Sequence, residues 1–195
     1  MAQLFVSKED EQTLAPIAIA TMGTLFAREL VNTPVIDLTA TDLANQAKKA
    51  SKRHGFSIEV LEKKQIESLK MGGLLAVNYG SPEPPVFIIM EHKPKNAKNE
   101  KPLVLVGKGV VYDTGGLSLK PSNFMDDMKS DMGGAAAVIG AMSAAAEADL
   151  PVHIIGLVPA TDNRPGGNAV TPGDVITISD GTSVEVMNTD AEGRL

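Results

Sequence analysis

The sequence contains no cysteine. This absence excludes disulfide bonds, thiolate metal sites and a cysteine nucleophile, and a reducing compartment is the simplest expectation. No uninterrupted apolar run reaches the ~20 residues of a membrane-spanning helix. The N-terminal segment MAQLFVSKEDEQ becomes acidic too early to resemble a secretory signal. We therefore expect a cytoplasmic protein without a membrane partner.

Positive charge is also scarce, because the net charge is −6 and the isoelectric point is about 5.1. A nucleic-acid surface needs a dense patch of lysine and arginine. The basic residues of 48–53 and 93–101 are scattered among polar ones, which is typical of a solvated surface. The composition, 43% apolar and 22% charged, is instead that of a soluble domain, and 195 residues suffice to bury a core. We expect no nucleic-acid partner.

Helical periodicity dominates the first quarter of the chain. Apolar residues recur at spacings of three and four between positions 9 and 30, which predicts one face of a helix. That face comprises Leu14, Ile17, Ala18, Met22, Leu25, Phe26 and Leu30. Asn32-Thr33-Pro34 interrupts the pattern. Thr39 and Asp42 then give a start signal for a second helix, which runs to about His54 and stops at Gly55.

Strand patterns alternate with further helices. Strands are predicted at 56–61, 74–79, 86–90, 103–106 and 152–158, and helices at 63–71 and 131–148. The all-apolar run Leu103–Val106 is typical of a buried central strand. Asp180-Gly181, between strands at 175–178 and 184–187, indicates a hairpin. The alternation predicts an α/β fold whose sheet is mixed but mainly parallel.

The segment VGKGVVYDTGGLSLKP, residues 106–121, carries the first charged residues of interest. Lys108 follows the predicted strand, and Asp113 and Lys120 come later in a glycine-rich loop, where glycines permit close approach of a ligand. A phosphate-binding loop is the main alternative. It requires Ser or Thr after the Gly-Lys pair, whereas Gly109 stands there, and Asp113 would repel phosphate.

Two later segments, MDDMKSDMGGAAAV and NTDAEGRL, add further carboxylates. Asp131 stands at the expected start of a helix, so an N-cap is the alternative to a ligand role. In NTDAEGRL the charged residues Asp190, Glu192 and Arg194 alternate, so in an extended segment they point the same way. An exposed edge of the protein is the alternative for these three.

Four carboxylates, those of Asp113, Asp131, Asp190 and Glu192, lie at or just past predicted strand ends. An open α/β sheet gathers its ligands there. If they converged unaided, they would repel one another and their pKa values would rise. Two divalent cations would remove that cost, since carboxylates can bridge ions about 3.5–4 Å apart. The three histidines are isolated, so the pattern predicts a carboxylate-rich two-metal hydrolase site.

The motifs GKGVVYDTGGLSLKP, MKSDMGGAA and NTDAEGRL resemble the signatures of the cytosolic leucine aminopeptidase (leucyl aminopeptidase) family of dinuclear metallopeptidases. NTDAEGRL matches in full, and ARELVNTPVIDLTATDLA is similar to the family's linker helix and domain entrance. The resemblance implies that residues 1–34 are a linker helix. Residues 35–195 would be the first part of an incomplete catalytic domain, a three-layer α/β sandwich. The family's N-terminal domain and the rest of its catalytic domain are absent from this sequence.

Carried over by position, the resemblance implies two divalent ions, Zn²⁺ or Mn²⁺ and possibly Mg²⁺. Lys108, Asp113, Asp131 and Glu192 would hold one ion, and Asp113, Asp190 and Glu192 the other. Asp113 and Glu192 would therefore bridge the two ions. A lysine ligand binds as the neutral amine, so the cations would have to depress the pKa of Lys108.

The resemblance also implies roles for residues around the ions. Lys120 would polarise the scissile carbonyl, and Arg194 would anchor a bicarbonate-like anion that assists proton transfer from the bridging water. Met128 would line the pocket for the first side chain of the substrate, although it could instead fill a gap in the core. At positions 111 and 112 this sequence has Val111 and Tyr112, where the family more often has Thr and Phe. Both substitutions are small changes at apolar positions.

Three functional interpretations follow. The first is an aminopeptidase that releases N-terminal leucine-like residues from peptides. The second is an inactive or partial fragment of such an enzyme, and the third is a metal- or nucleotide-binding module. Because Asp190 and Glu192 lie close to the last residue, we expect them to fray and to bind metal weakly. The family forms hexamers, so a homo-oligomer is the expected assembly of the intact protein.

Overall fold

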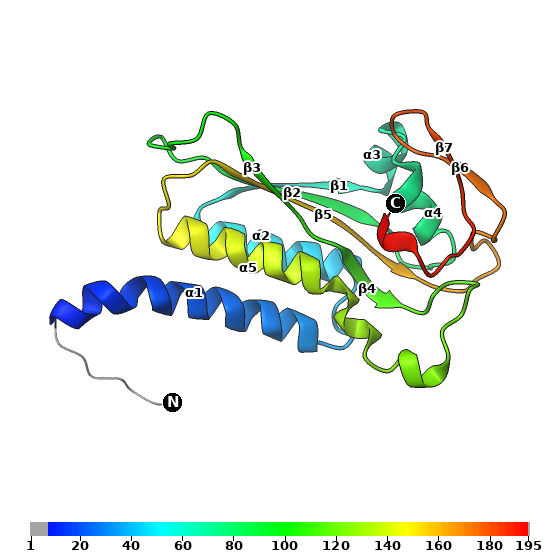
Figure 1. The fold of residues 1–195 in the computed structure, drawn as a ribbon, viewed down its shortest axis with the longest axis horizontal. Coiled ribbons are helices and arrows are strands. Elements are labelled where there is room, and N and C mark those ends of the chain that lie inside the picture. The colour runs from blue at the N-terminus through cyan, green and yellow to red at the C-terminus, as the bar shows by residue number, and fades with distance from the viewer. Residues whose placement is uncertain (1–7, 195) are drawn as a thin grey trace.

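The computed structural model describes residues 8–194 (Figure 1). Residues 1–7 of the predicted linker and Leu195 of NTDAEGRL lie outside them. The helices are α1 (Lys8–Asn32), α2 (Ala40–His54), α3 (Lys63–Ser68), α4 (Gly72–Asn78) and α5 (Gly133–Glu147). The strands are β1 (Ser57–Glu62), β2 (Val86–His92), β3 (Leu103–Val106), β4 (Gly109–Asp113), β5 (Ile154–Asn163), β6 (Val175–Thr177) and β7 (Ser183–Glu185). Short 3₁₀ helices span Ser122–Phe124, Met128–Met132 and Glu192–Arg194.

Strand β5 is the centre of the main sheet. It pairs antiparallel with β2, which in turn pairs antiparallel with the edge strand β1. On its other side β5 pairs in parallel first with β3 and then with β4. Lys108 lies at the junction of β3 and β4. The sheet is therefore mixed, as expected, with its pairings divided equally between parallel and antiparallel.

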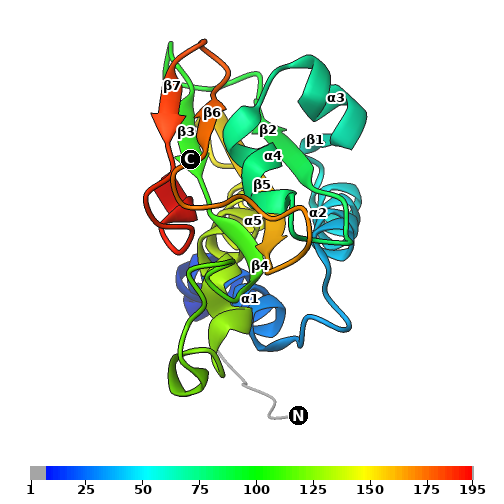
Figure 2. The ribbon, with the colours of Figure 1, turned by 90° about the vertical axis from the view of Figure 1, so that its right-hand side faces the viewer.

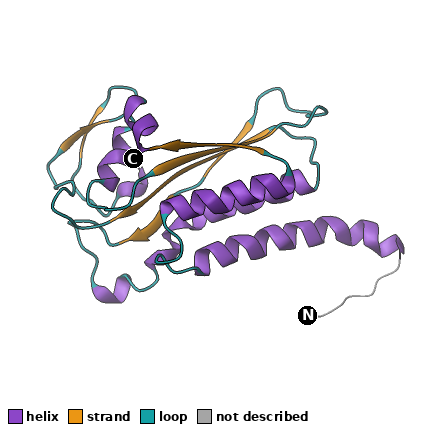
Figure 3. Cartoon of the chain, turned by 180° about the vertical axis from the view of Figure 1, so that it is seen from behind, coloured by secondary structure: helices purple, strands orange, loops and turns teal. Residues whose placement is uncertain are grey.

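Helices cover both faces of this sheet, which confirms the three-layer architecture. Helices α2 and α5 lie along one face, with α1 outside α5, while α3 and α4 lie on the other (Figures 1 and 3). The core between the sheet and α2 and α5 is fully closed to solvent. It includes Leu43, Ile88, Met90, Ile139, Met142 and Val158, all with no exposed surface.

Helix α2 begins and ends where the sequence signals predict. Thr39 Oγ1 accepts a hydrogen bond from the Asp42 backbone N–H at 3.2 Å, and Asp42 Oδ2 accepts one from the Thr39 N–H at 3.1 Å. This reciprocal pair is a capping box. Gly55 ends the helix with a φ of 88°, a left-handed conformation that glycine adopts without strain.

Helix α1 packs differently from the prediction. Three members of its predicted apolar face, Ile17, Met22 and Leu25, are at least half exposed. The helix approaches α5 mainly through small residues. A Cβ added to Gly23 would lie 2.8 Å from the carbonyl oxygen of Gly140, and one added to Gly140 would lie 2.6 Å from that of Gly23. Two glycines therefore permit a backbone contact that the hydrophobic periodicity does not reveal.

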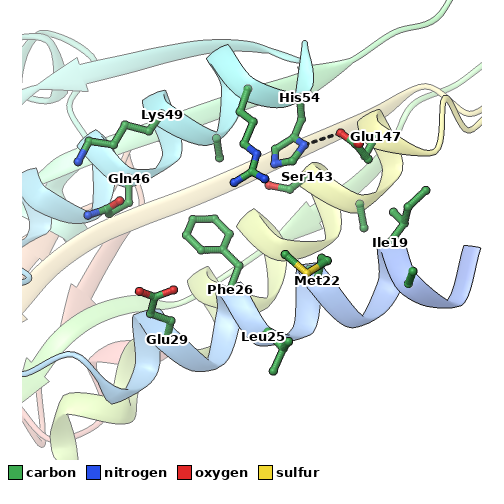
Figure 4. A pocket seen from close by; sticks show the side chains of 15 residues that line it. Ile19, Met22, Leu25, Phe26, Glu29, Gln46, Lys49, His54, Ser143 and Glu147 are labelled. Atoms are coloured by element: carbon green, nitrogen blue, oxygen red, sulfur yellow. Dashed lines mark hydrogen bonds and ion pairs between the residues drawn. The ribbon is translucent and has the colours of Figure 1, made fainter. Parts of the chain in front are cut away.

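An open pocket of about 430 Å³ lies between α1, α2 and α5 (Figure 4). Met22 and Phe26 of α1 form part of its apolar lining, and Lys49 of α2 lies at its rim. His54 Nδ1 and Glu147 Oε2, 2.8 Å apart, join α2 to α5 at one end. The pocket leaves much of the apolar surface of α1 in contact with solvent.

Length and composition alone would allow one described helix to cross a membrane. Its segment Thr13–Asn32 has a mean hydropathy of 1.4, and only 6% of it is buried. A single helix of this kind is weak evidence for a membrane span, because mostly buried core helices and signal sequences satisfy the same criteria. The segment is interrupted by polar residues, so it is not one of the uninterrupted apolar runs whose absence was noted from the sequence.

Two segments were assigned the wrong type of secondary structure. The segment predicted as a strand at 74–79 lies mainly in helix α4, because short apolar runs fit both periods. Gly109–Asp113, expected to be loop, forms strand β4 beside β5. The helix predicted from 131 begins two residues later, after a 3₁₀ turn.

Strand β3 is not the buried central strand that its composition predicts. It lies at the edge of the sheet, and Leu103, Val104 and Val106 are 47–71% exposed. Strand β3 pairs with β5 along its whole length, with Leu103 opposite Ile154 at one end and Val106 opposite Leu157 at the other. An apolar edge strand of this kind is a template for further association.

Candidate metal centre

The predicted charged residues converge where β4 and β5 end. Lys108 comes from the β3–β4 junction, Asp113 ends β4, and Lys120 comes from the loop that follows. The 3₁₀ helix before α5 supplies Asp131. The last described segment, drawn in red in Figure 2, supplies Asp190 and Glu192.

Each of the two lysines joins two carboxylates. Lys108 Nζ lies 2.8 Å from Asp131 Oδ2 and 2.6 Å from Glu192 Oε1. Lys120 Nζ lies 2.9 Å from Asp113 Oδ2 and also contacts Asp190 Oδ1. Four carboxylates therefore share two ammonium groups, which leaves a formal excess of two negative charges.

Among the described residues, one group of acidic side chains has the geometry of a cation site. Asp113, Asp190 and Glu192 each offer a ligand oxygen, and these oxygens lie within 4.8 Å of one another. Asp113 and Glu192 are only 3% and 6% exposed. Buried carboxylate oxygens with uncompensated negative charge fit hard or intermediate divalent ions such as Mg²⁺, Mn²⁺ or Zn²⁺. Asp131 is connected to this group through Lys108.

The two lysines hold their protons firmly. Burial lowers the pKa of Lys108, but its hydrogen bonds to Asp131 and Glu192 outweigh burial and raise the pKa above 10.5. Burial is outweighed in the same way at Lys120, where Asp190 and Asp113 raise the pKa. Both side chains are therefore ammonium ions at neutral pH. A ligand role for Lys108 requires that a metal ion displace its proton.

The pKa values of two carboxylates, those of Asp131 and Asp113, are shifted in opposite directions. At Asp131 burial is the largest influence, and it raises the pKa above 3.8 although Lys108 opposes it. At Asp113 burial also favours the neutral acid, but hydrogen bonds from Lys120, the Gly115 N–H and Asn163 outweigh it and lower the pKa. Asp113 is thus held as the anion in the centre of the site.

The segment that carries Asp190 and Glu192 is bound to the loop after β4. Thr189 Oγ1 donates to the Gly115 carbonyl at 2.6 Å and accepts from the Ser118 N–H at 2.8 Å. The Thr189 N–H donates to Ser118 Oγ at 3.1 Å. Thr189 is 3% exposed. These hydrogen bonds hold Thr189, and fraying of the residues after it stays a prediction.

Sequence reasoning missed Asn163, a buried residue at the end of β5. Its amide Nδ2 lies within 2.9 Å of Asp113 Oδ1 and 3.3 Å of Glu192 Oε2. The available signal was its place at the carboxyl end of a central strand, where α/β sheets position ligands. An isolated Asn between Asp162 and Arg164 matches no sequence motif and has no unusual composition around it.

The two remaining predicted residues lie at the margin. Arg194 is exposed in the last 3₁₀ helix, and it forms no ion pair with another described residue. Met128 is half-buried in the 3₁₀ helix that also contains Asp131. Their roles stay predictions.

Sequence comparison identifies relatives over most of the chain. The family model described as "Cytosol aminopeptidase family, catalytic domain" matches residues 25–195. A probable cytosol aminopeptidase of Chlorobaculum tepidum is 60% identical over 169 residues, covering 87% of this chain and 33% of the relative. One of Methylobacillus flagellatus is 49% identical over 187 residues, covering 96% and 38%. The chain thus spans about a third of the length of these relatives.

Solved structures give the same picture of the fold. The structure "Bottromycin maturation enzyme BotP in complex with Mn" matches with a TM-score of 0.93 and 39% identity, covering 100% of this chain and 42% of that one. A second structure of the same enzyme matches with a TM-score of 0.90 and 38% identity. The arrangement of helices and sheet is therefore shared over the full length of the described chain.

Proposed function

This chain belongs to the cytosol aminopeptidase family, and on that premise we propose that it carries the two-metal site of an aminopeptidase acting on N-terminal leucine-like residues. The observation that supports the proposal is the convergence of Asp113, Asp190 and Glu192 within 4.8 Å. Residues 1–34 would then be a linker helix, and 35–195 the first part of a catalytic domain. A cytoplasmic hexamer is the proposed setting.

The family resemblance implies which residues would hold the ions. Lys108, Asp113, Asp131 and Glu192 would hold one ion, and Asp113, Asp190 and Glu192 the other. When bound, two divalent ions of Zn²⁺, Mn²⁺ or Mg²⁺ supply Lewis acidity and an acidified water. Without metal, each of the four carboxylates contacts the ammonium group of Lys108 or Lys120.

Lys120 would act directly on the substrate. Its Nζ lies between Asp113 and Asp190, 2.9 Å from Asp113 Oδ2. An ammonium in this position can donate to the oxygen of the scissile carbonyl and stabilise the negative charge that develops there. It thereby favours the tetrahedral intermediate over the planar peptide.

Arg194 and Met128 would serve the same reaction from the margin of the site. The exposed guanidinium of Arg194 has its donors available for a bicarbonate-like anion, which would pass the proton of the attacking water to the leaving amine. Met128 would present an apolar surface to the first side chain of a leucine-like substrate.

An inactive or weakly metal-binding fragment is the alternative. The observation that favours it is coverage, because the chain spans about a third of its curated relatives. The exposed apolar residues of α1 and β3 are consistent with surfaces that further polypeptide would cover. The two candidates differ in activity and share the same metal ligands.

Turnover distinguishes them. The purified chain is incubated with leucine p-nitroanilide and Mn²⁺ or Zn²⁺, with and without a chelator. Lys120→Ala is expected to lower kcat by about 10²–10³-fold, because it removes an oxyanion donor. Lys95→Ala, at an exposed loop position, is the matched control and should be unchanged. Metal binding without chelator-sensitive turnover would support the fragment instead.

A further inference from the structure

Asn163 contacts three acceptors from two segments of the candidate metal centre with one side-chain amide. Its Nδ2 donates to Asp113 Oδ1 at 2.9 Å and to the Thr189 carbonyl at 2.9 Å, and it lies 3.3 Å from Glu192 Oε2. A carboxamide nitrogen carries two N–H donors, so three acceptors share them. Asn163 is 3% exposed, so water does not compete for these donors.

The backbone of Asn163 is fixed by the sheet. Asn163 is the last residue of the central strand β5 and pairs with Asp113 of β4. Its carbonyl accepts hydrogen bonds from the Thr114 N–H at 3.0 Å and from Thr114 Oγ1 at 2.8 Å. A side chain placed on a paired strand is held more accurately than one on a loop. The amide is therefore a rigid reference point for the segments around it.

In each of two carboxylates, the Asn163 amide occupies one oxygen and leaves the other to a lysine ammonium group. Asp113 Oδ1 accepts from Asn163 and from the Gly115 N–H, which leaves Oδ2 to Lys120. Glu192 Oε2 faces Asn163, which leaves Oε1 to Lys108. In each carboxylate one oxygen is tied to neutral donors, and the other is directed at a positive charge.

We propose that Asn163 is a positioning residue that orients Asp113 and Glu192 for metal binding; this rests on the metal centre proposed above. The two carboxylates repel each other, and they come from positions 50 residues before and 29 residues after Asn163. A neutral donor between them sets their separation without adding charge. Residues that orient metal ligands in this way strongly affect metal affinity.

Metal affinity is the first test. Asn163→Ala should raise the dissociation constant for Mn²⁺ by about 10–100-fold in calorimetric titration of the full chain. Asn78→Ala is the matched control, because Asn78 is also buried and its Nδ2 donates to the Glu83 carbonyl and to Thr161 Oγ1. The control should lose stability without losing Mn²⁺ affinity. A dissociation constant of Asn163→Ala for Mn²⁺ within about twofold of the wild-type value, measured as precisely as that of Asn78→Ala, would overturn the proposal.

A second readout needs no metal. In the presence of chelator, amide hydrogen exchange at 189–194 should be about 10-fold faster in Asn163→Ala and in the isosteric Asn163→Asp, since both lack the N–H donors. Exchange there should not change in Asn78→Ala. If the wild-type chain binds no Mn²⁺, the metal centre itself is disproved, and the exchange experiment alone then decides the positioning role. Unchanged exchange in both Asn163 variants would reject it.

Discussion

The candidate metal centre and the outer surface of α1 show opposite relations between side-chain chemistry and burial. At the centre the polar residues Asp113, Thr189 and Glu192 are at most 6% exposed. On α1 the apolar residues Ile17 and Met22 are each 58% exposed. Burial of a polar group costs little when it has partners, and each of these polar residues has them. In these two regions burial therefore follows the availability of contacts: polar side chains are buried where they have hydrogen-bond or ion-pair partners, and apolar side chains of α1 stay exposed where no other element covers them.

Two methionines give the largest test of this comparison. Met142 of α5 has no exposed surface, whereas Met22 of α1 is 58% exposed. Met142→Ala should lower the free energy of unfolding by about 2–5 kcal/mol, because it opens a cavity in the core. Met22→Ala should change it by less than about 0.5 kcal/mol. Urea denaturation of both variants measures the two values, and similar losses would show that α1 is buried in solution.

Two threonines test the polar side of the comparison. Thr189→Val keeps the volume but removes the hydroxyl that bonds Gly115 and Ser118, so it should cost about 1–3 kcal/mol. The same change at Thr21 removes only an exposed bond to the Ile17 carbonyl within α1. It should cost less than about 0.5 kcal/mol. Equal effects in urea denaturation would contradict a special role for the buried hydroxyl.

The pH dependence of stability tests the ion pairs of the centre. The folded pKa of Lys120 is raised above 10.5 by its carboxylate partners, although burial opposes them. The resulting stability is fully present below about pH 10.5 and is lost as the pH rises through the folded pKa. We expect a loss on the order of 1 kcal/mol between about pH 10.5 and pH 11.5 in the absence of metal.

Lys120→Met provides the control for this titration. The variant lacks the ammonium, so its stability should fall less over the same alkaline range than that of the wild type. Urea denaturation at each pH gives both slopes. Parallel slopes would assign the alkaline loss to other lysines or tyrosines.

The edge strand β3 should give the smallest change in stability. Val106 is 71% exposed, so Val106→Lys should alter the free energy of unfolding by less than about 0.5 kcal/mol. The added charge should nevertheless reduce self-association, because lysine protects exposed sheet edges. Light scattering across a concentration series measures this effect. An unchanged scattering profile would indicate that the strand does not promote association.

Features with local causes were predicted well from the sequence. The capping box of Thr39 and Asp42 and the stop at Gly55 were confirmed, because each depends on residues within one helical turn. The hairpin at Asp180-Gly181 was also confirmed, with β6 and β7 on either side. The carboxylates were expected to converge at strand ends, but only Asp113 ends a strand of the main sheet, while Asp131 and Glu192 lie in 3₁₀ helices.

Features that depend on distant neighbours were not predicted. The contact of Gly23 with Gly140 joins residues of two helices, and no pattern within α1 reveals it. The apolar composition of β3 indicates burial, but composition does not say whether a neighbouring strand is present. Asn163 was missed for the same reason, since its three acceptors come from two other segments.

The separation of Lys108 from Glu192, which is 84 residues, also has a consequence during translation. At about 5–20 residues per second, Lys108 is synthesised roughly 4–17 s before Glu192. In that interval the lysines and Asp113 exist without their partners from the last segment. A nascent chain therefore cannot bring these side chains together until synthesis has passed Glu192.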